Sequence, residues 1–289
     1  MDRIIRHLNL SSDAEKIVKD IYSKYGETDE FVALSKDLRE GRTLEDEYYK
    51  KYNEFAEKIG VNKYELGMSL VVVNAYWAKD AYIRKGYDEQ LFWDTIFDVK
   101  YKIDECFDKN GIWGIEPLGW YTRIFNAELF QLGRLQFEEK PLKDGGKIIG
   151  MHIPSGAPLT YESVMDAYKK AYNFFPKTHG NLMAFTCYSY LILPEYQGAV
   201  FKEGSNVYNY AKDFYILYSA YEEVFHDGWR IFGPEFNEDP TKLPGKTSLQ
   251  RAFAEYFING GKAGESRGVF FFDGENILTE KGRELEGLI

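Results

Sequence analysis

Residues 147–175, KIIGMHIPSGAPLTYESVMDAYKKAYNFF, decide the fold that we predict for this chain. A short apolar strand (residues 147–153) leads through a loop of prolines and small residues into an amphipathic helix. Thr160 is the predicted N-cap of that helix, because its side-chain oxygen can accept a hydrogen bond from an amide of the first turn. A strand that runs through a tight loop into a capped helix predicts an α/β unit.

Further strand patterns lie on both sides of this stretch. Residues 128–137 are apolar with partial alternation, and the turn at residues 143–146 joins them to residues 147–153 as a predicted hairpin. Residues 182–193 have the composition of a buried strand. The later predicted elements are a strand pair at 213–224 and 229–232, a helix at 247–257 and a last strand at 268–272. This order predicts an α/β (α+β) domain with a mixed sheet over residues 126–289.

Residues 1–125 predict an all-helical domain that ends in a connection to the sheet domain. Ser12 with Glu15 has the spacing of a capping box, and Gly26 is expected to end that helix in the left-handed conformation. A second helix is predicted to begin at Thr43. Apolar side chains at helical spacing mark each helix, the last of them with Phe92, Ile96, Val99 and Ile103 on one face.

Composition and charge exclude several classes of protein. The chain has 289 residues, of which 44% are hydrophobic, so it can bury the cores of two domains. Its 36 basic and 46 acidic residues make a net charge of −10, which is not the footprint of a nucleic-acid binder. Two cysteines form neither a disulfide framework nor a zinc cluster. The longest apolar stretch, residues 68–78, is too short to cross a bilayer. We therefore expect a soluble, cytoplasmic, bacterial-type protein that binds no metal, and the oligomeric state stays open.

The second half of the chain resembles a known family. That family comprises bacterial acyltransferase-domain proteins with a helical N-terminal domain and a GNAT-like C-terminal domain. The resemblance rests on short motifs in the family's order, at residues 132–137, 152–154, 187–190, 205–206, 243–244 and 247–252, with Gly260 and Gly268. The family usually has tryptophan where this chain has Tyr190. The resemblance implies a GNAT-like mixed-sheet domain at 126–289 and acyl transfer from acyl-CoA or acetyl-CoA to an amine of a small-molecule substrate.

In such enzymes the coenzyme's pyrophosphate is held where a strand runs into a helix, because unpaired amides and the helix dipole favour an anion there. The matching residues here are Ser155, Gly156, Ala157 and Thr160. Glycine permits close approach of a phosphate to the backbone. The alternative is that this segment only makes a tight loop and a capped helix. The usual pyrophosphate signature, Gln/Arg-x-x-Gly-x-Gly/Ala, is absent from the loop, and residues 194–198 carry only its beginning.

Acyl transfer also needs a base for the amine and a proton donor for the departing thiolate. His152 is the predicted base, since it ends the strand beside this loop, and Tyr190 is a predicted donor. Alternation along a strand would place Cys187 and Ser189 on one face and Tyr190 on the other. The alternatives are a structural histidine, a core tyrosine and an inert, buried cysteine.

Three further residues are predicted to bind the acceptor. Arg134 and Gln136 would share one strand face, where they either bind substrate or brace the sheet, and Asn206 either contacts ligand or caps a helix. Two other functions compete with the transferase. One is a non-catalytic small-ligand-binding protein on a degenerate GNAT fold, which the 17% aromatic content would suit. The other is a hydrolase using Ser189 or Cys187 with His152, although no Gly-x-Ser-x-Gly motif supports it.

Overall fold

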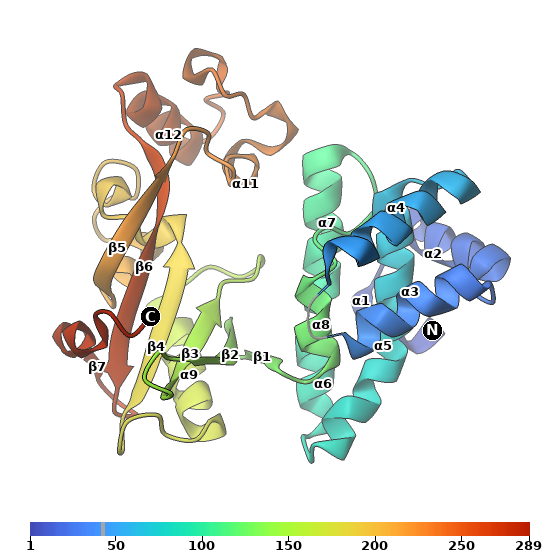
Figure 1. The fold of residues 1–289 in the computed structure, drawn as a ribbon. Helices are drawn as coiled ribbons and strands as arrows, with labels where there is room; N and C mark the ends of the chain where they lie inside the picture. The colour runs from blue at the N-terminus through green and yellow to red at the C-terminus, as the bar shows by residue number, and fades with distance from the viewer. Residues whose placement is uncertain (42–43) are drawn as a thin grey trace. The chain divides into compact units, whose positions relative to one another are not determined.

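The computed structural model describes residues 1–41 and 44–289, and the chain divides into two compact units, Met1–Gln131 and Leu132–Ile289. Figure 1 shows helices in the first unit and a sheet with flanking helices in the second. This is the predicted fold class, an all-helical region followed by a mixed sheet. No helix of the described ranges is long and apolar enough to cross a membrane.

The first unit is organised around one helix, α5 (Lys63–Arg84), which contacts the other helices described in this unit. Buried residues lie all round α5, as expected of a helix at the centre of a bundle. Around it lie α1 (Asp2–Leu8), α2 (Ser12–Tyr25), α3 (Asp29–Glu40), α4 (Asp46–Ile59), α6 (Glu89–Ile96), α7 (Asp98–Asn110) and α8 (Trp120–Phe125).

Three predictions about helix boundaries in this unit are wrong. The N-cap of α2 is Ser11 and not Ser12, since the Ser11 hydroxyl accepts the Ala14 amide at 3.2 Å. Gly26 keeps right-handed φ of −57°, because the chain turns within two residues into the cap of α3. The last predicted helix is broken at Phe97 into α6 and α7. The predicted helix start at Thr43 lies outside the described residues.

The sheet of the second unit has the order β1-β2-β3-β4-β6-β5, with β7 paired to β6. Strand β3 runs parallel to β4, and the pairs β2–β3, β4–β6, β5–β6 and β6–β7 are antiparallel. The predicted hairpin is confirmed as β2–β3, with the Asp144 carboxylate accepting the Gly146 amide at 2.8 Å in its turn. The strands are β1 (Leu129–Leu132), β2 (Leu135–Pro141), β3 (Lys147–His152), β4 (Met183–Ser189), β5 (Tyr215–Glu222), β6 (Ala263–Phe272) and β7 (Ile277–Leu278).

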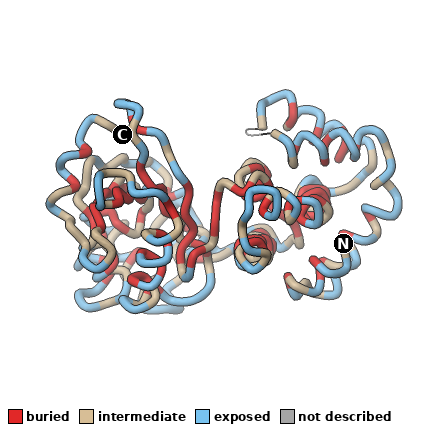
Figure 2. Tube along the Cα trace, turned by 90° about the horizontal axis from the view of Figure 1, so that it is seen from below, coloured by how far each residue is buried: buried red, intermediate tan, exposed pale blue. Residues whose placement is uncertain are grey.

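Helices pack against this sheet, and Figure 2 shows buried residues in red along its strands. The α-helices are α9 (Tyr161–Phe174), α10 (Asn206–Ala211), α11 (Trp229–Phe232) and α12 (Ser248–Ile258). The 3-10 helices are η1 (Tyr190–Ile192), η2 (Pro194–Tyr196), η3 (Gly233–Glu235), η4 (Pro240–Lys242) and η5 (Glu280–Leu285).

The two faces of the sheet are covered differently. One face, which we call the helix-covered face, carries Phe137, Met151, Phe185, Cys187 and Phe270, all buried. The Tyr168 ring of α9 packs against Phe185 and Phe270 at 5.7 and 5.0 Å. The opposite face, which we call the His152 face, is covered at one end by η5, in a cluster of Leu142, Ile148, Ala184, Val269, Phe271 and Leu285.

Three predicted elements of the sheet domain are wrong in type or length. Residues 229–232 form helix α11 and not a strand. The strand predicted over residues 182–193 ends at Ser189, whose hydroxyl accepts the Leu191 amide at 3.1 Å and begins η1. The strand predicted at residues 128–137 is two strands, because Gly133 turns the chain with a left-handed φ of +70°.

Candidate functional site

The loop between β3 and α9 has the geometry expected of a built turn and a capped helix. Thr160 is the N-cap of α9, as predicted, and its hydroxyl accepts the Ser163 amide at 3.3 Å. Gly156 has a φ of +113°, which side-chain-bearing residues rarely adopt. Arg134 donates a hydrogen bond from Nε to the carbonyl oxygen of Ala157. Arg134 therefore ties the loop to the turn between β1 and β2.

His152 ends β3 and is bonded to a buried carboxylate. Its Nε2 lies 2.7 Å from Oε1 of Glu138 on β2, and the Glu138 side chain is 8% exposed. The Lys140 ammonium reaches the same carboxylate oxygen at 3.1 Å. Because a carboxylate only accepts hydrogen bonds, Nε2 of His152 is the donor in this pair, and the bond orients the imidazole ring.

The strand register explains how this group is assembled. Glu138 pairs with Gly150, and Gln136 pairs with His152, so these side chains share one face. A Cβ on Gly150 would lie 2.5 Å from Cε of Lys140, so the lysine stem occupies the space of the missing side chain on its way to Glu138. Gln136 is 1% exposed, and its Nε2 has no hydrogen-bond partner in the described part of the chain.

Strands β3 and β4 part beside His152. Their ladder runs from Ile149 and Phe185 to Met151 and Cys187, whereas β4 continues along β6 as far as the pair of Ser189 with Ser266. His152 therefore stands where the ladder ends and the chain of β3 turns into the loop.

Cys187 lies on the helix-covered face, opposite to His152. It is 1% exposed and accepts a hydrogen bond from the Tyr210 hydroxyl at 3.8 Å. Burial raises the pKa of the Cys187 thiol to about 11, so it is a neutral thiol near pH 7. Ser189 shares that side of the strand. The hydrolase hypothesis, which needs either residue beside His152, is therefore wrong.

The remaining predicted residues are not brought into this group. Tyr190 is the first residue of η1 and its ring packs 5.4 Å from that of Phe225, in an aromatic cluster under α12. Asn206 is the first residue of α10, whose N-cap is Ser205. Arg134 lies in a turn and not on a strand, so the shared strand face predicted for Arg134 and Gln136 is wrong.

Two residues of this region were missed by sequence reasoning. Glu138 could have been found, because counting back from the turn at residues 143–146 places it across from Gly150 and diagonal to His152. Arg267 lies on β6, which begins at Ala263, whereas the predicted strand began at Gly268.

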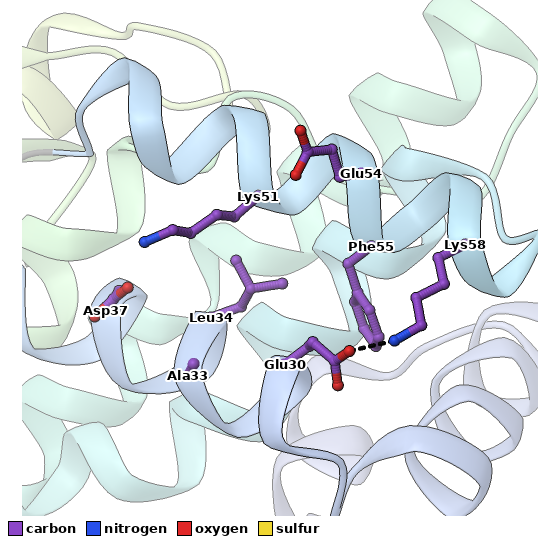
Figure 3. Close-up of a pocket in the computed structure, with 8 residues that line it drawn as sticks. All are labelled: Glu30, Ala33, Leu34, Asp37, Lys51, Glu54, Phe55 and Lys58. Carbon is purple, nitrogen blue, oxygen red and sulfur yellow. Dashed lines mark hydrogen bonds and ion pairs between the residues drawn. The ribbon is translucent and has the colours of Figure 1, made fainter.

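A separate cavity of about 340 Å³ lies in the first unit between α3 and α4 (Figure 3). Leu34 and Phe55 line it, and at one end Lys58 is paired with Glu30. None of the predicted site residues lies there. Within residues 1–41 and 44–289, no group of His, Cys, Asp and Glu side chains is arranged to hold a metal ion.

Two family models match the chain. Residues 12–127 match the N-acyltransferase N-terminal domain, and residues 129–270 match the GNAT-like C-terminal domain. No curated protein sequence matches the chain significantly.

Solved structures of acyltransferases share this fold. An acyltransferase mutant in complex with octanoyl-CoA and an acyltransferase in complex with decanoyl-CoA and teicoplanin each superpose with a TM-score of 0.73 at 18% identity, over 93% of this chain and 86% of theirs. An acyltransferase in complex with decanoyl-CoA superposes with a TM-score of 0.64 at 17% identity, over 93% of this chain and 98% of its own.

Proposed function

We propose a function from the family to which this chain belongs, that of proteins joining an N-acyltransferase N-terminal domain to a GNAT-like C-terminal domain. The chain transfers an acyl group from acyl-CoA or acetyl-CoA to the amine of a small molecule. The observation that carries this proposal is the hydrogen bond of His152 to the buried Glu138, at the end of β3 and beside the loop into α9.

The loop is the proposed site of the coenzyme's pyrophosphate, with Ser155, Gly156, Ala157 and Thr160 around it. Thr160 caps only one amide of the first turn, and the others face the loop with the positive end of the helix dipole. The dipole contributes about 0.3–1 kcal/mol, so amide hydrogen bonds must supply the rest of the affinity. Structural neighbours crystallised with octanoyl-CoA and decanoyl-CoA support a donor of this class.

The chemistry follows from the His152–Glu138 pair. The acceptor amine attacks the thioester carbonyl carbon, so a C–N bond forms and the C–S bond breaks. His152 takes the proton that the amine loses, and the Glu138 carboxylate stabilises the resulting imidazolium. The same proton then neutralises the departing thiolate, which leaves amide and free coenzyme A.

Calorimetry with coenzyme A, acetyl-CoA and octanoyl-CoA tests the donor. Ligand at 100 times its dissociation constant stabilises the folded protein by about 2.7 kcal/mol, so thermal denaturation reports the same binding. If millimolar ligand produces no binding heat and no shift in the melting temperature, the proposal is wrong.

A thiol-release assay with octanoyl-CoA and simple amines then tests turnover. We expect His152→Ala to lower kcat by roughly 10²–10⁴-fold while leaving coenzyme binding unchanged. His226→Ala, at an exposed histidine, is the matched control. Binding without thiol release for any amine would support the non-catalytic ligand-binding protein instead.

A further inference from the structure

Arg267 carries a charge that has no ion-pair partner within residues 1–41 and 44–289. It lies on the interior strand β6 and is half-buried. Its guanidinium carbon stands 4.7 Å from the ring centroid of Tyr188. In the described residues the guanidinium makes no hydrogen bond or ion pair, and its Nε is buried without an acceptor. Withdrawing this N–H donor from water without an acceptor costs free energy.

Two exposed tyrosines flank this arginine. Tyr188 on β4 and Tyr218 on β5 are the direct register partners of Arg267. Their side chains are 38% and 49% exposed, and their ring centroids are 6.3 Å apart. The three side chains therefore form one row on the His152 face, with an aromatic surface beside an unpaired cation.

The same row continues to His152. Because Met151 pairs with Cys187, the following residues, His152 and Tyr188, project to the same face. One strand separates His152 from Arg267, so their Cα atoms are on the order of 10 Å apart. Beyond His152 lies Gln136, whose buried Nε2 also has no partner in the described chain.

Glu265 is a carboxyl on the same strand as Arg267. Glu265 is two residues away on β6, yet it forms no ion pair with Arg267 in the described ranges. Burial, together with Asp227 and Glu222, raises the pKa of Glu265 to about 7, although the charge of Arg267 acts in the opposite direction, so this carboxyl is only partly charged near neutral pH. Arg267 is therefore placed to meet an anionic group of a ligand.

We propose that Arg267 binds the carboxylate of the acceptor, whose ring lies against Tyr188 and Tyr218 while its amine reaches His152. The acceptor is thus an amine that also bears a carboxylate and an aromatic or sugar ring. A planar guanidinium suits a carboxylate because two N–H groups can meet its two oxygens. The helix-covered face is filled by α9 and α10, which leaves the His152 face for the acceptor. This inference rests on the proposed acyl transfer.

The test compares 4-(aminomethyl)benzoate with benzylamine, which differ only in the carboxylate, as acceptors with octanoyl-CoA. We expect the wild type to prefer the carboxylate probe in kcat/KM by about tenfold or more. Arg267→Gln should remove that preference, while the KM of octanoyl-CoA stays the same. Arg267→Lys, which keeps the charge but not the paired N–H geometry, should restore part of it.

The outcomes separate the two anions that Arg267 could meet. If Arg267→Gln instead weakens coenzyme A binding and keeps the acceptor preference, the arginine holds a donor phosphate and the inference is wrong. Equal turnover of both amines by the wild type would also overturn it.

A binding measurement keeps this inference distinct from the transferase proposal. Calorimetry of 4-(aminomethyl)benzoate needs no turnover, and we expect heat with the wild type, little with Arg267→Gln and unchanged heat with Arg251→Gln. Arg251 is an exposed arginine that bonds loop carbonyls at Gly245 and Lys246. If 4-(aminomethyl)benzoate binds and coenzyme A does not, only the transferase proposal is wrong. If coenzyme A binds and 4-(aminomethyl)benzoate does not, only the acceptor site is wrong.

Discussion

Polar groups on the two faces of the sheet differ in whether they have hydrogen-bond partners. On the helix-covered face, the Cys187 thiol is bonded to Tyr210, and the Tyr168 hydroxyl donates to the Asp213 carboxylate at 3.1 Å. Burial raises the pKa of each of these phenols well above its usual value, so they stay neutral. On the His152 face, Gln136 and Arg267 keep donors without partners in the described chain.

The difference separates packing from chemistry. Groups that are buried, bonded to each other and neutral stabilise a core and have nothing left for a substrate. Unpaired donors beside a histidine that is bonded to a carboxylate cost stability, and such sites are where function is found. Mutations on the helix-covered face should therefore change mainly the free energy of unfolding, and mutations on the His152 face should change mainly the activity.

The largest effect should come from emptying the core of the helix-covered face. Phe185 is fully buried, with its ring 5.2 Å from that of Phe270, and Phe185→Ala should lower the free energy of unfolding by about 3–5 kcal/mol. Tyr188→Ala, three residues along the same strand but on the other face, should cost about 1 kcal/mol or less. Urea denaturation measures both. Equal losses would remove the contrast between the faces.

The next effect concerns the carboxylate behind His152. Glu138→Gln should lower kcat by roughly 10–100-fold, because an amide stabilises the imidazolium less than a carboxylate does. Coenzyme affinity should not change. Glu139→Gln is the matched control, since Glu139 is the exposed neighbour that pairs with Lys147 at 3.1 Å. If the two variants lose activity equally in the thiol-release assay, Glu138 has no special role.

A smaller effect should appear in the pH dependence of stability. Burial raises the pKa of Asp213 to about 7, above its ordinary value of 3.8. Between these values the folded protein holds a proton that the unfolded chain has lost, so this contribution to stability is full below about pH 4 and is lost as pH rises through about 7. Asp213→Asn cannot lose that proton, so its stability relative to wild type should rise from nearly equal at pH 4 to clearly greater at pH 8. Melting temperatures that stay parallel from pH 4 to 8 would contradict this reading of Asp213.

The smallest effect is expected at the cysteine of the helix-covered face. Cys187→Ala should keep kcat within about twofold of wild type, because a neutral, buried thiol takes no part in the transfer. The native protein should also leave Cys187 unmodified by iodoacetamide, as judged by mass spectrometry of peptides. Loss of turnover in Cys187→Ala at unchanged melting temperature would place the thiol in the mechanism.

Local patterns were enough for those parts of the fold that depend on near neighbours. Thr160 caps α9 because a hydroxyl at that position meets an amide three residues on, and the β2–β3 hairpin follows from its turn. The strand predicted at 229–232 is wrong because an apolar run of this length is too short to show a period, so it fits a strand and a helix equally well. The strand predicted through Tyr190 ends early because the Ser189 hydroxyl binds the Leu191 amide and begins η1, which replaces further hydrogen bonds of the strand.

The amino-acid sequence by itself determined the two-part organisation, the strand–loop–helix unit around residues 147–175 and the position of His152 at its junction. Hydrophobic periodicity and capping carry that information, and both act over a few residues. Only the tertiary structure decided which side chains meet. Glu138 reaches His152 across a register, Arg267 lies beside two tyrosines from other strands, and Cys187 faces away from all of them. One residue of shift in pairing would exchange the two faces, so the site depends on the packing of the whole sheet.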